Sequence, residues 1–224
     1  MQELQDLEIF EIETLHVLNQ IRILDNLYFG GGTMLRLCHN LNRYSKDLDF
    51  WIKPLDSYRS YFEKIHQAFS TTFTVKDAEE KSNTLLFEIH SPISTRNLVV
   101  EIRKDQLGFQ WERKIAFSKF SRHQIVVKGL TLEQMMSNKI NALLSRKLIR
   151  DCFDVEFLLF RGIPLRVEKE KLHDIIKILE SFKERDFKVI LGSLLEEKDR
   201  IFHTENRFQF LREEIQKQIQ REVT

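Results

Sequence analysis

The stretch that most constrains the fold of this chain runs from Phe29 to Phe50 and reads FGGGTMLRLCHNLNRYSKDLDF. Gly30, Gly31 and Gly32 follow an apolar approach and precede a short segment with apolar residues at helical spacing, which indicates a strand, a tight turn and a helix start. Glycine has no Cβ, so its backbone can take a positive φ and come close to a ligand. The free N–H groups and the positive dipole end of a helix that starts there favour phosphate as this ligand. Thr33 adds a hydroxyl at the same place.

Two carboxylates follow in the same stretch, at the start of a second apolar run. Asp47 and Asp49 lie two residues apart, and residues i and i+2 of a strand face the same side. Hard oxygen ligands on one face suit Mg²⁺, which is commonly shared between one or two carboxylates and substrate phosphates. A glycine turn or an Asp-x-Asp pair alone is more often a plain turn or a solvated strand edge. Together they form one unit that could hold a triphosphate and its metal.

At this point the sequence resembles a known family, the nucleotidyltransferase toxins of the AbiEii and MenT type. The signature of these toxins is Gly-Gly-Thr, a small or apolar residue and Leu, followed after a gap by Arg-x-Ser-x-Asp-x-Asp-Phe. The residues that match it are Gly31, Gly32, Thr33, Leu35, Arg43, Ser45, Asp47, Asp49 and Phe50. The general nucleotidyltransferase pattern has Gly-Ser where this chain has Gly32-Thr33, and threonine keeps the hydroxyl.

A second block of the family signature occurs later, in a region with helical periodicity. The family pattern is Lys-x-x-Ala-Leu, then Arg, then Arg-Asp-x-x-Asp. It is matched in order by Lys139, Ala142, Leu143, Arg146, Arg150, Asp151 and Asp154. From Arg166 onward the resemblance is weakest, and no functional residue is predicted there.

The resemblance implies an α+β fold in which a nucleotidyltransferase-like mixed β-sheet with flanking helices is followed by a helical C-terminal part. We place the catalytic domain at residues 1–130. We expect residues 131–224 to form a helical domain that completes the active-site cleft. Thr131, with Glu133 and Gln134 near the first turn, is a good N-cap for the first helix of that part.

A third carboxylate is expected on a strand next to the Asp-x-Asp strand, as in other nucleotidyltransferase folds. Glu101 is the only acid inside the apolar run 98–102, and a charged group is rarely buried there unless it is paired or metal-bound. Glu88, flanked by Phe87 and Ile89, is the rival for this role.

These features give each candidate site residue an expected role. Asp47, Asp49 and Glu101 would bind metal, and these three with Lys139 and Asp151 would be the catalytic residues. Nucleotide would be held by Gly31, Gly32, Thr33, Arg43, Ser45, Lys139 and Arg146. Asp151 could orient Lys139 or act on the acceptor, and Arg43, Ser45, Arg150 and Asp154 resemble supporting residues.

The function that the resemblance implies is Mg²⁺-dependent transfer of an NMP from an NTP to an acceptor, in particular an RNA such as the tRNA 3′ end. The protein would act as the toxin of a bacterial toxin–antitoxin or phage abortive infection system, with a cognate antitoxin as partner. One alternative is nucleotidylylation of a protein hydroxyl. Another is a non-catalytic nucleotide-sensing module, against which the intact Asp47 and Asp49 argue, because a degenerate enzyme has no need of a paired metal site.

The amino-acid composition limits the kinds of binding partner and the cell compartment that we expect. Lys+Arg 35 against Asp+Glu 34 gives a formal net charge of +1 with no strongly one-sided segment, so there is no bulk electrostatic case for duplex binding. The 18 Phe residues recur singly beside apolar neighbours and indicate core filling. Cys38 and Cys152 form no Cys-x-x-Cys pair, which indicates a reducing compartment without a zinc site or disulfide framework. No apolar run is long enough to cross a membrane, so we expect a soluble, cytoplasmic protein.

Periodicity also predicts secondary structure. It favours a long helix over 4–27, continuous or broken, and a helix over 58–69 capped by Asp56-Ser57. Strands are predicted at 73–75, 85–89, 98–102 and 124–127, and helices at 168–182, 185–198 and 205–221.

Overall fold

The computed structural model describes residues 2–55, 57–104 and 108–221 of the chain. The chain forms two compact units, Met1–Thr131 and Leu132–Thr224. Their division lies within one residue of the boundary expected from the change to helical periodicity. No helix in the described ranges combines the length and apolar character that a membrane span requires.

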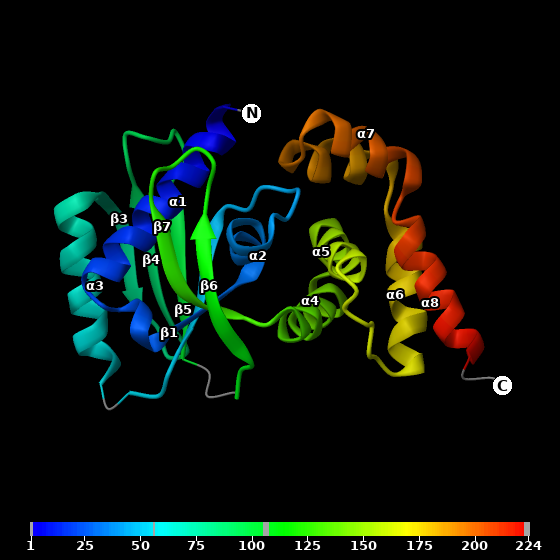
Figure 1. Cartoon of the computed structure of the whole chain (residues 1–224), viewed down its shortest axis with the longest axis horizontal. Helices are drawn as coiled ribbons and strands as arrows, with labels where there is room; N and C mark the ends of the chain where they lie inside the picture. The colour runs from blue at the N-terminus through cyan, green and yellow to red at the C-terminus, as the bar shows by residue number, and fades with distance from the viewer. Residues whose placement is uncertain (1, 56, 105–107, 222–224) are drawn as a thin grey trace. The chain divides into compact units, whose positions relative to one another are not determined.

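The first unit is built on a mixed seven-stranded sheet with the strand order β3-β4-β5-β2-β1-β7-β6 (Figure 1). This confirms the predicted fold class. The strands are β1 Leu27–Gly30, β2 Asp47–Ile52, β3 Thr74–Glu80, β4 Thr84–His90, β5 Leu98–Arg103, β6 Trp111–Phe117 and β7 Gln124–Leu130. The helices of this unit are α1 Gln2–Gln20, the 3-10 turn η1 Leu24–Asn26, α2 Gly31–His39 and α3 Tyr58–Thr72.

The two faces of the central strands differ because apolar and polar residues alternate along them. In β2 the side chains of Leu48 and Phe50 are buried, whereas Asp47 and Asp49 are half-buried on the other face. Strands β4 and β5 repeat this alternation. Helices α1 and α3 pack on the apolar face, where the Phe62 ring of α3 stacks on Phe87 of β4 with 5.0 Å between centroids. We call the opposite face, which bears Asp47, Asp49 and Glu101, the carboxylate face.

Register brings the chemistry-bearing residues of the carboxylate face together. β2 runs antiparallel to β1 and parallel to β5, so Asp49 pairs with Gly30 on one side and with Glu101 on the other. β1 and β7 are parallel, with Phe29 beside Gly129. Neighbouring strands are about 4.8 Å apart, so these rungs form closely spaced rows across the sheet.

The second unit is helical in its described part. Its helices are α4 Leu132–Arg146, α5 Ile149–Phe160, α6 Lys169–Ser181, α7 Glu197–Asn206 and α8 Gln209–Arg221, with the π-helix η2 Asp186–Leu191 and the 3-10 turn η3 Gly192–Leu194. The apolar faces of α5, α6 and α8 form its core, which includes Leu158, Leu172, Ile175, Leu211 and Ile215.

Several predicted elements differ from the observed ones. The N-terminal helix ends at Gln20, and Arg22 takes a positive φ of 57°. The cap of α3 is Ser57, whose side chain accepts from the Ser60 N–H, while Asp56 lies outside the described residues.

Two predicted helices differ more strongly from the observed elements, and one strand was not predicted at all. The helix expected over 185–198 is wrong, because η2 and η3 replace it and the chain turns before α7. The last helix begins at Gln209 rather than at residue 205, because Arg207 and Phe208 take positive φ. Strand β6 was not predicted, since only Ala116 of its residues is buried and no apolar alternation marks it.

Candidate active site

The centre of the candidate site is the point where β1 passes directly into α2. Gly31 takes a φ of +73°, a conformation that L side chains rarely adopt. A Cβ at Gly31 would lie 2.1 Å from Oδ2 of Asp49, so only glycine allows the carboxylate to come this close to the helix start. The glycine turn and the Asp-x-Asp strand therefore form one constellation.

Gly32 makes a second close approach at the same helix start. A Cβ there would lie 2.6 Å from Nη2 of Arg43 and 2.8 Å from Oγ of Ser45. The Arg43 guanidinium is buried and donates through Nη1 to the carbonyl of Tyr44 at 3.0 Å. The fold thus brings Gly32, Arg43 and Ser45 together beneath the first turn of α2, as the motif spacing suggested.

The three acidic candidates lie in adjacent rows of the carboxylate face. Asp49 and Glu101 are direct register partners on β2 and β5, and both are half-buried. Glu88 lies one strand further away, opposite Val99, and its carboxylate accepts a hydrogen bond of 2.6 Å from the Asn97 amide. The geometry therefore favours Glu101 over Glu88 as the acid that acts with Asp49.

Arg103 was not predicted and stands directly beside this pair of acids. Its Nε lies 3.0 Å from Oε1 of Glu101, and its Nη2 lies 3.8 Å from Oδ1 of Asp49. The guanidinium therefore bridges the two carboxylates as their counter-ion. Since Arg103 follows Glu101 by two residues in a strand, the sequence did contain a signal for this contact.

The oxygen atoms that these side chains offer decide whether they fit a magnesium ion. Asp47, Asp49 and Glu101 offer carboxylate oxygens on one face, which suit a hard cation, and the Arg103 guanidinium already provides a positive charge there. Among the described residues, no group of three His, Cys, Asp or Glu side chains is pre-assembled in metal-binding geometry. The residues fit a shared site, in which two carboxylates and substrate phosphates together supply the ligands.

Thr33 lies beneath the site rather than facing the turn. Its side chain is fully buried, and its hydroxyl donates to the carbonyl of Asp47 at 2.7 Å. Nucleotide contact at this position would therefore come from the backbone N–H group, while the hydroxyl fixes the start of β2 against α2.

A buried acidic network on α1 supports Thr33. Oε1 of Glu11 lies 3.5 Å from the Thr33 hydroxyl, and burial, reinforced by the negative charge of Glu8, raises the pKa of Glu11 well above its ordinary value. The Thr33 hydroxyl thus lies between the Glu11 carboxyl group and the Asp47 carbonyl, and it donates to that carbonyl. Glu8 itself pairs with Arg36 of α2 and accepts 2.6 Å from the Ser118 hydroxyl.

The second unit carries the other block of candidates as two ion pairs between α4 and α5. Nζ of Lys139 lies 2.6 Å from Oδ2 of Asp154, and both side chains are buried. Nη2 of Arg146 lies 2.8 Å from Oδ1 of Asp151, whose Oδ2 is buried without a hydrogen-bond partner. The expectation that Asp151 could orient Lys139 is thus corrected, because Asp154 holds the lysine and Asp151 holds Arg146.

Arg150 and the thiol of Cys152 accompany these pairs on α5. Arg150 is half-buried, whereas Cys152 is fully buried. Burial, with the negative charge of Asp151 next in size, raises the pKa of the Cys152 thiol well above its ordinary value. The thiol is therefore protonated and inert near neutral pH.

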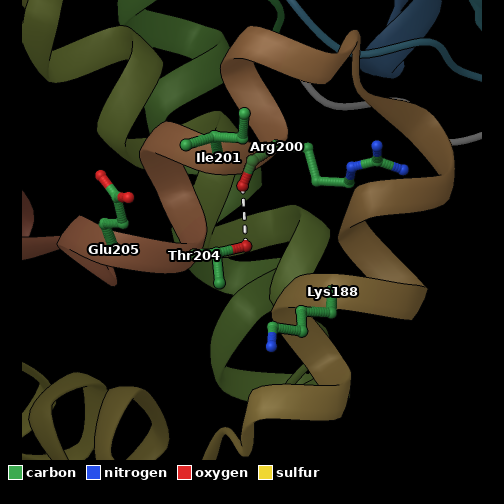
Figure 2. Close-up of a pocket in the computed structure, with 5 residues that line it drawn as sticks. All are labelled: Lys188, Arg200, Ile201, Thr204 and Glu205. Carbon is green, nitrogen blue, oxygen red and sulfur yellow. Dashed lines mark hydrogen bonds between the residues drawn. The ribbon is translucent and has the colours of Figure 1, made fainter.

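A separate hollow of about 450 Å³ lies between η2 and α7 in the second unit (Figure 2). It is lined by Lys188, Arg200, Ile201, Thr204 and Glu205. The dashed line in Figure 2 is a bond within α7, from the Thr204 hydroxyl to the carbonyl of Arg200 at 2.7 Å. None of the predicted site residues lines this hollow.

Solved structures with the same fold come from Helicobacter pylori. The crystal structure of JHP933 matches with a TM-score of 0.53 and 18% identity, covering 96% of this chain and 94% of that one. A candidate nucleotidyltransferase of H. pylori matches with a TM-score of 0.54 and 16% identity, covering 93% of this chain and 96% of that one. A search of curated proteins found no match. The chain therefore shares its fold with these two H. pylori proteins.

The family assignment follows from a second comparison. The family model described as nucleotidyl transferase AbiEii toxin, type IV toxin–antitoxin system, matches residues 16–222, and the chain belongs to this family. The resemblance drawn from the two sequence blocks is thereby confirmed, and the protein is a nucleotidyltransferase.

Proposed function

We propose that this protein is the toxin of a type IV toxin–antitoxin pair and transfers an NMP from an NTP to an RNA end, such as the tRNA 3′ end, with Mg²⁺ as cofactor and a cognate antitoxin as partner. The observation that carries the proposal is the row Gly30, Asp49 and Glu101 across three strands, next to the glycine start of α2. Both cysteines are free thiols, which supports action in the reducing cytoplasm.

The chemistry is an in-line displacement at the α-phosphorus of the NTP. A bond forms between the acceptor hydroxyl oxygen and the α-phosphorus, and the bond from the α-phosphorus to the bridging oxygen breaks, so pyrophosphate leaves. Bound Mg²⁺ would neutralise the phosphate charge, held by Asp47 and Asp49 with Glu101. Glu101 is placed to accept the proton that the acceptor hydroxyl loses.

The start of α2 binds the triphosphate in this proposal. Gly31 and Gly32 present backbone N–H groups without side chains, and the positive end of the helix dipole favours the anion. Arg43 adds buried positive charge beneath the turn. Thr33 keeps the turn fixed to β2 through its bond to Asp47.

Lys139 supplies a point charge for the nucleotide, and Asp154 orients it. A buried lysine paired at 2.6 Å is held in one geometry, which suits a positioned cation. Arg146, half-exposed and anchored by Asp151, can assist at a phosphate.

The decisive experiment incubates the purified protein with each α-labelled NTP, Mg²⁺ and total RNA or lysate, and then asks which fraction carries label. We expect label on RNA, lost in Asp49→Asn and Lys139→Ala. Lys139→Arg should restore little activity, because the planar guanidinium group of arginine does not replace the compact charge of the lysine ammonium group. Lys171→Ala, at an exposed pair with Glu168 on α6, is the matched control and should be fully active.

Label found only on protein would replace the RNA acceptor with a protein hydroxyl. Absence of label with every NTP, while NTP still binds, would leave a nucleotide-sensing module. A second comparison tests the third acid: Glu101→Gln should bind NTP normally and lose roughly 10²-fold or more in turnover. If Glu88→Gln shows that loss and Glu101→Gln does not, the acid lies on the other strand.

A further inference from the structure

A row of one cation, two aromatic rings and two further cations crosses the carboxylate face, next to the row that holds Asp49 and Glu101. Arg103, Trp51 and Tyr28 are register partners on β5, β2 and β1. Lys128 and Arg113 are partners on β7 and β6, and the pairing of Phe29 with Gly129 places Lys128 beside Tyr28. We call Arg103, Trp51, Tyr28, Lys128 and Arg113 the aromatic–cation band. Across five strands the band spans roughly 19 Å.

Additional rings widen the band into a surface. The centroid of the Phe109 ring lies 5.3 Å from that of Trp51 and 6.0 Å from that of Tyr28. The Trp111 ring lies 5.9 Å from Tyr28 and is 40% exposed. Both tryptophans of the chain therefore lie here, Trp51 buried and Trp111 exposed. An exposed indole that stands among other rings is suited to stacking on a planar ligand.

The cations are placed over the rings and lack acidic partners at the β6 end. Arg103 lies over the Trp51 ring at 5.2 Å, and Lys128 lies over the Trp111 ring at 5.3 Å. Within the described residues, no ion pair joins Lys53, Arg113 or Lys128 to a carboxylate. Burial and the nearby charge of Lys53 hold the pKa of Lys128 below its ordinary value. Like charges gathered in this way favour a polyanion that separates them.

Two further contacts limit what can occupy the surface. Lys128 donates to the carbonyl of Asp25, so its ammonium group is held at the edge of the rings. Glu112, the acid next to Trp111, pairs with Lys114 on the other face of the β6–β7 hairpin. The surface is therefore aromatic and cationic, with Asp49 and Glu101 at one end only.

We infer that the aromatic–cation band, with Trp111, is the binding surface for the single-stranded end of the RNA acceptor. A base stacks on the exposed Trp111 ring, and phosphates contact Lys53, Lys128 and Arg113. Stacking on aromatic side chains combined with backbone cations is how proteins hold single-stranded nucleic acid, because every base has a flat face. A duplex hides those faces, so this surface selects unpaired ends.

The position of the band determines what it does for the reaction. Trp51 follows Asp49 by two residues on the same face of β2, so a strand bound along the band ends beside the carboxylates. The inference rests on the proposed RNA acceptor, and it names where that acceptor binds. Phosphate contacts confined to Lys53, Lys128 and Arg113 also fit an end-binding enzyme without an extended basic stripe.

The test measures binding without catalysis, in the presence of EDTA. A short labelled single-stranded RNA, its blunt duplex form and NTP alone are each titrated with the full chain, and anisotropy and tryptophan fluorescence are followed. We expect the single strand to bind and to quench the tryptophans, with a salt slope corresponding to roughly two to four phosphate contacts. The duplex should bind much more weakly.

Variants locate the surface. Trp111→Ala should weaken single-strand binding roughly five- to 100-fold, and Trp111→Phe should recover most of it. Lys128→Ala should lower the salt slope by about one. Lys76→Glu, on the opposite edge strand β3 and exposed, is the matched charge control for Arg113→Glu and should leave RNA affinity unchanged.

The outcomes separate this inference from the proposed function. Trp111-dependent RNA binding without any transfer to RNA would uphold the surface and reject the acceptor proposal. Transfer to RNA with an affinity that Trp111→Ala and Arg113→Glu leave unchanged would overturn the surface. Tryptophan quenching by NTP and not by RNA would also overturn the inference, because the surface would then bind the base of the incoming nucleotide.

Discussion

Arg103 is the residue that most changes how the carboxylates are understood. A guanidinium between Glu101 and Asp49 holds two neighbouring acids close together. It also competes with any cation for the same oxygens. Half-exposed pairs of this kind contribute only about 1 kcal/mol each, so the competition is modest and reversible.

We therefore expect Arg103→Gln to bind Mn²⁺ or Mg²⁺ roughly three- to tenfold more tightly in a calorimetric titration without nucleotide. The glutamine keeps a polar side chain and removes the positive charge. Arg59→Gln, at an exposed pair with Glu63 on α3, is the control and should leave metal affinity unchanged. Equal or weaker metal binding by Arg103→Gln would show that Arg103 does not occupy the cation position.

At the scale of single elements, α1 acts as a support for the start of α2. Its buried face carries Glu8 and Glu11 among apolar residues, and these two acids contact Arg36 and Thr33 of α2. The Arg36 guanidinium also lies 3.6 Å above the Tyr44 ring, between α2 and β2. The helix that we propose as the phosphate cradle is thus held in place by polar contacts as well as by packing.

The raised pKa of Glu11 gives this support a pH dependence. The folded state keeps a proton that the unfolded state releases above the ordinary value of 4.5, so stability falls as pH rises from there through the folded pKa. In denaturant unfolding followed by tryptophan fluorescence, Glu11→Gln should remove this loss of stability at higher pH. The difference in free energy of unfolding between Glu11→Gln and the wild type should grow by up to about 1.4 kcal/mol per pH unit.

The control for this prediction is Asp6→Asn on the exposed side of the same helix. Its difference from the wild type should stay constant over the same pH range. Parallel pH curves for Glu11→Gln and the wild type would mean that Glu11 is not protonated in the folded protein.

How far the elements could be predicted depended on whether their residues alternate. β5 was predicted at 98–102, almost to its ends, because it is an apolar run with a single acid and its buried residues Leu98, Val100 and Ile102 recur at every second position. β6 carries Glu112, Arg113 and Lys114 at a sheet edge, where one buried alanine leaves no such pattern. The π-helix η2 has helical composition, and only tertiary contacts decide its hydrogen-bond pattern.

The geometric features that follow from the motif itself were the ones predicted. Spacing placed Asp47 and Asp49 on one face, and the glycine turn allowed for the positive φ that Gly31 takes. Which acid pairs with Lys139 depends on how α4 packs on α5, which no spacing fixes, so Asp151 was given a contact that belongs to Asp154. The aromatic–cation band was not predicted, because its members come from five separate strands.

At the scale of the whole molecule, the two units carry different optical reporters. Every Trp and Tyr lies in the first unit, so tryptophan fluorescence follows its unfolding alone. The second unit has its own titrating pair, Glu156 of α5 and His203 of α7, with 3.6 Å between Oε2 and Nδ1. Burial raises the pKa of Glu156 to about 7 and lowers the pKa of His203 to about 4.

These two pKa shifts have opposite effects on the stability of the folded state. The stability that Glu156 contributes falls as pH rises from 4.5 to about 7, and the stability that His203 contributes falls as pH drops from 6.5 to about 4. Between pH 4.5 and 6.5 they cancel. We expect Glu156→Gln to expose the His203 slope, so that stability of the second unit rises with pH over that range by up to about 1.4 kcal/mol per unit.

This slope should appear in far-UV circular dichroism and not in the tryptophan transition. Glu168→Gln, an exposed acid before α6, serves as the control. A flat profile for Glu156→Gln would show that the pair does not hold its proton on the carboxyl group.

Strand β6 ends the sheet, and among the described residues no further strand pairs with its outer side. Ile115, Phe117 and Val126 are exposed on this hairpin, a composition that would invite edge-to-edge aggregation between copies. The charges of Arg113 and Lys114 oppose such pairing. We expect a solution of the double variant Arg113→Thr and Lys114→Thr to aggregate on standing, as measured by light scattering. The same change at Lys76 and Lys81 should not cause aggregation. Arg113, which we assign to RNA binding, would thus also help to keep the protein from precipitating, which limits how freely substitutions can accumulate along this edge.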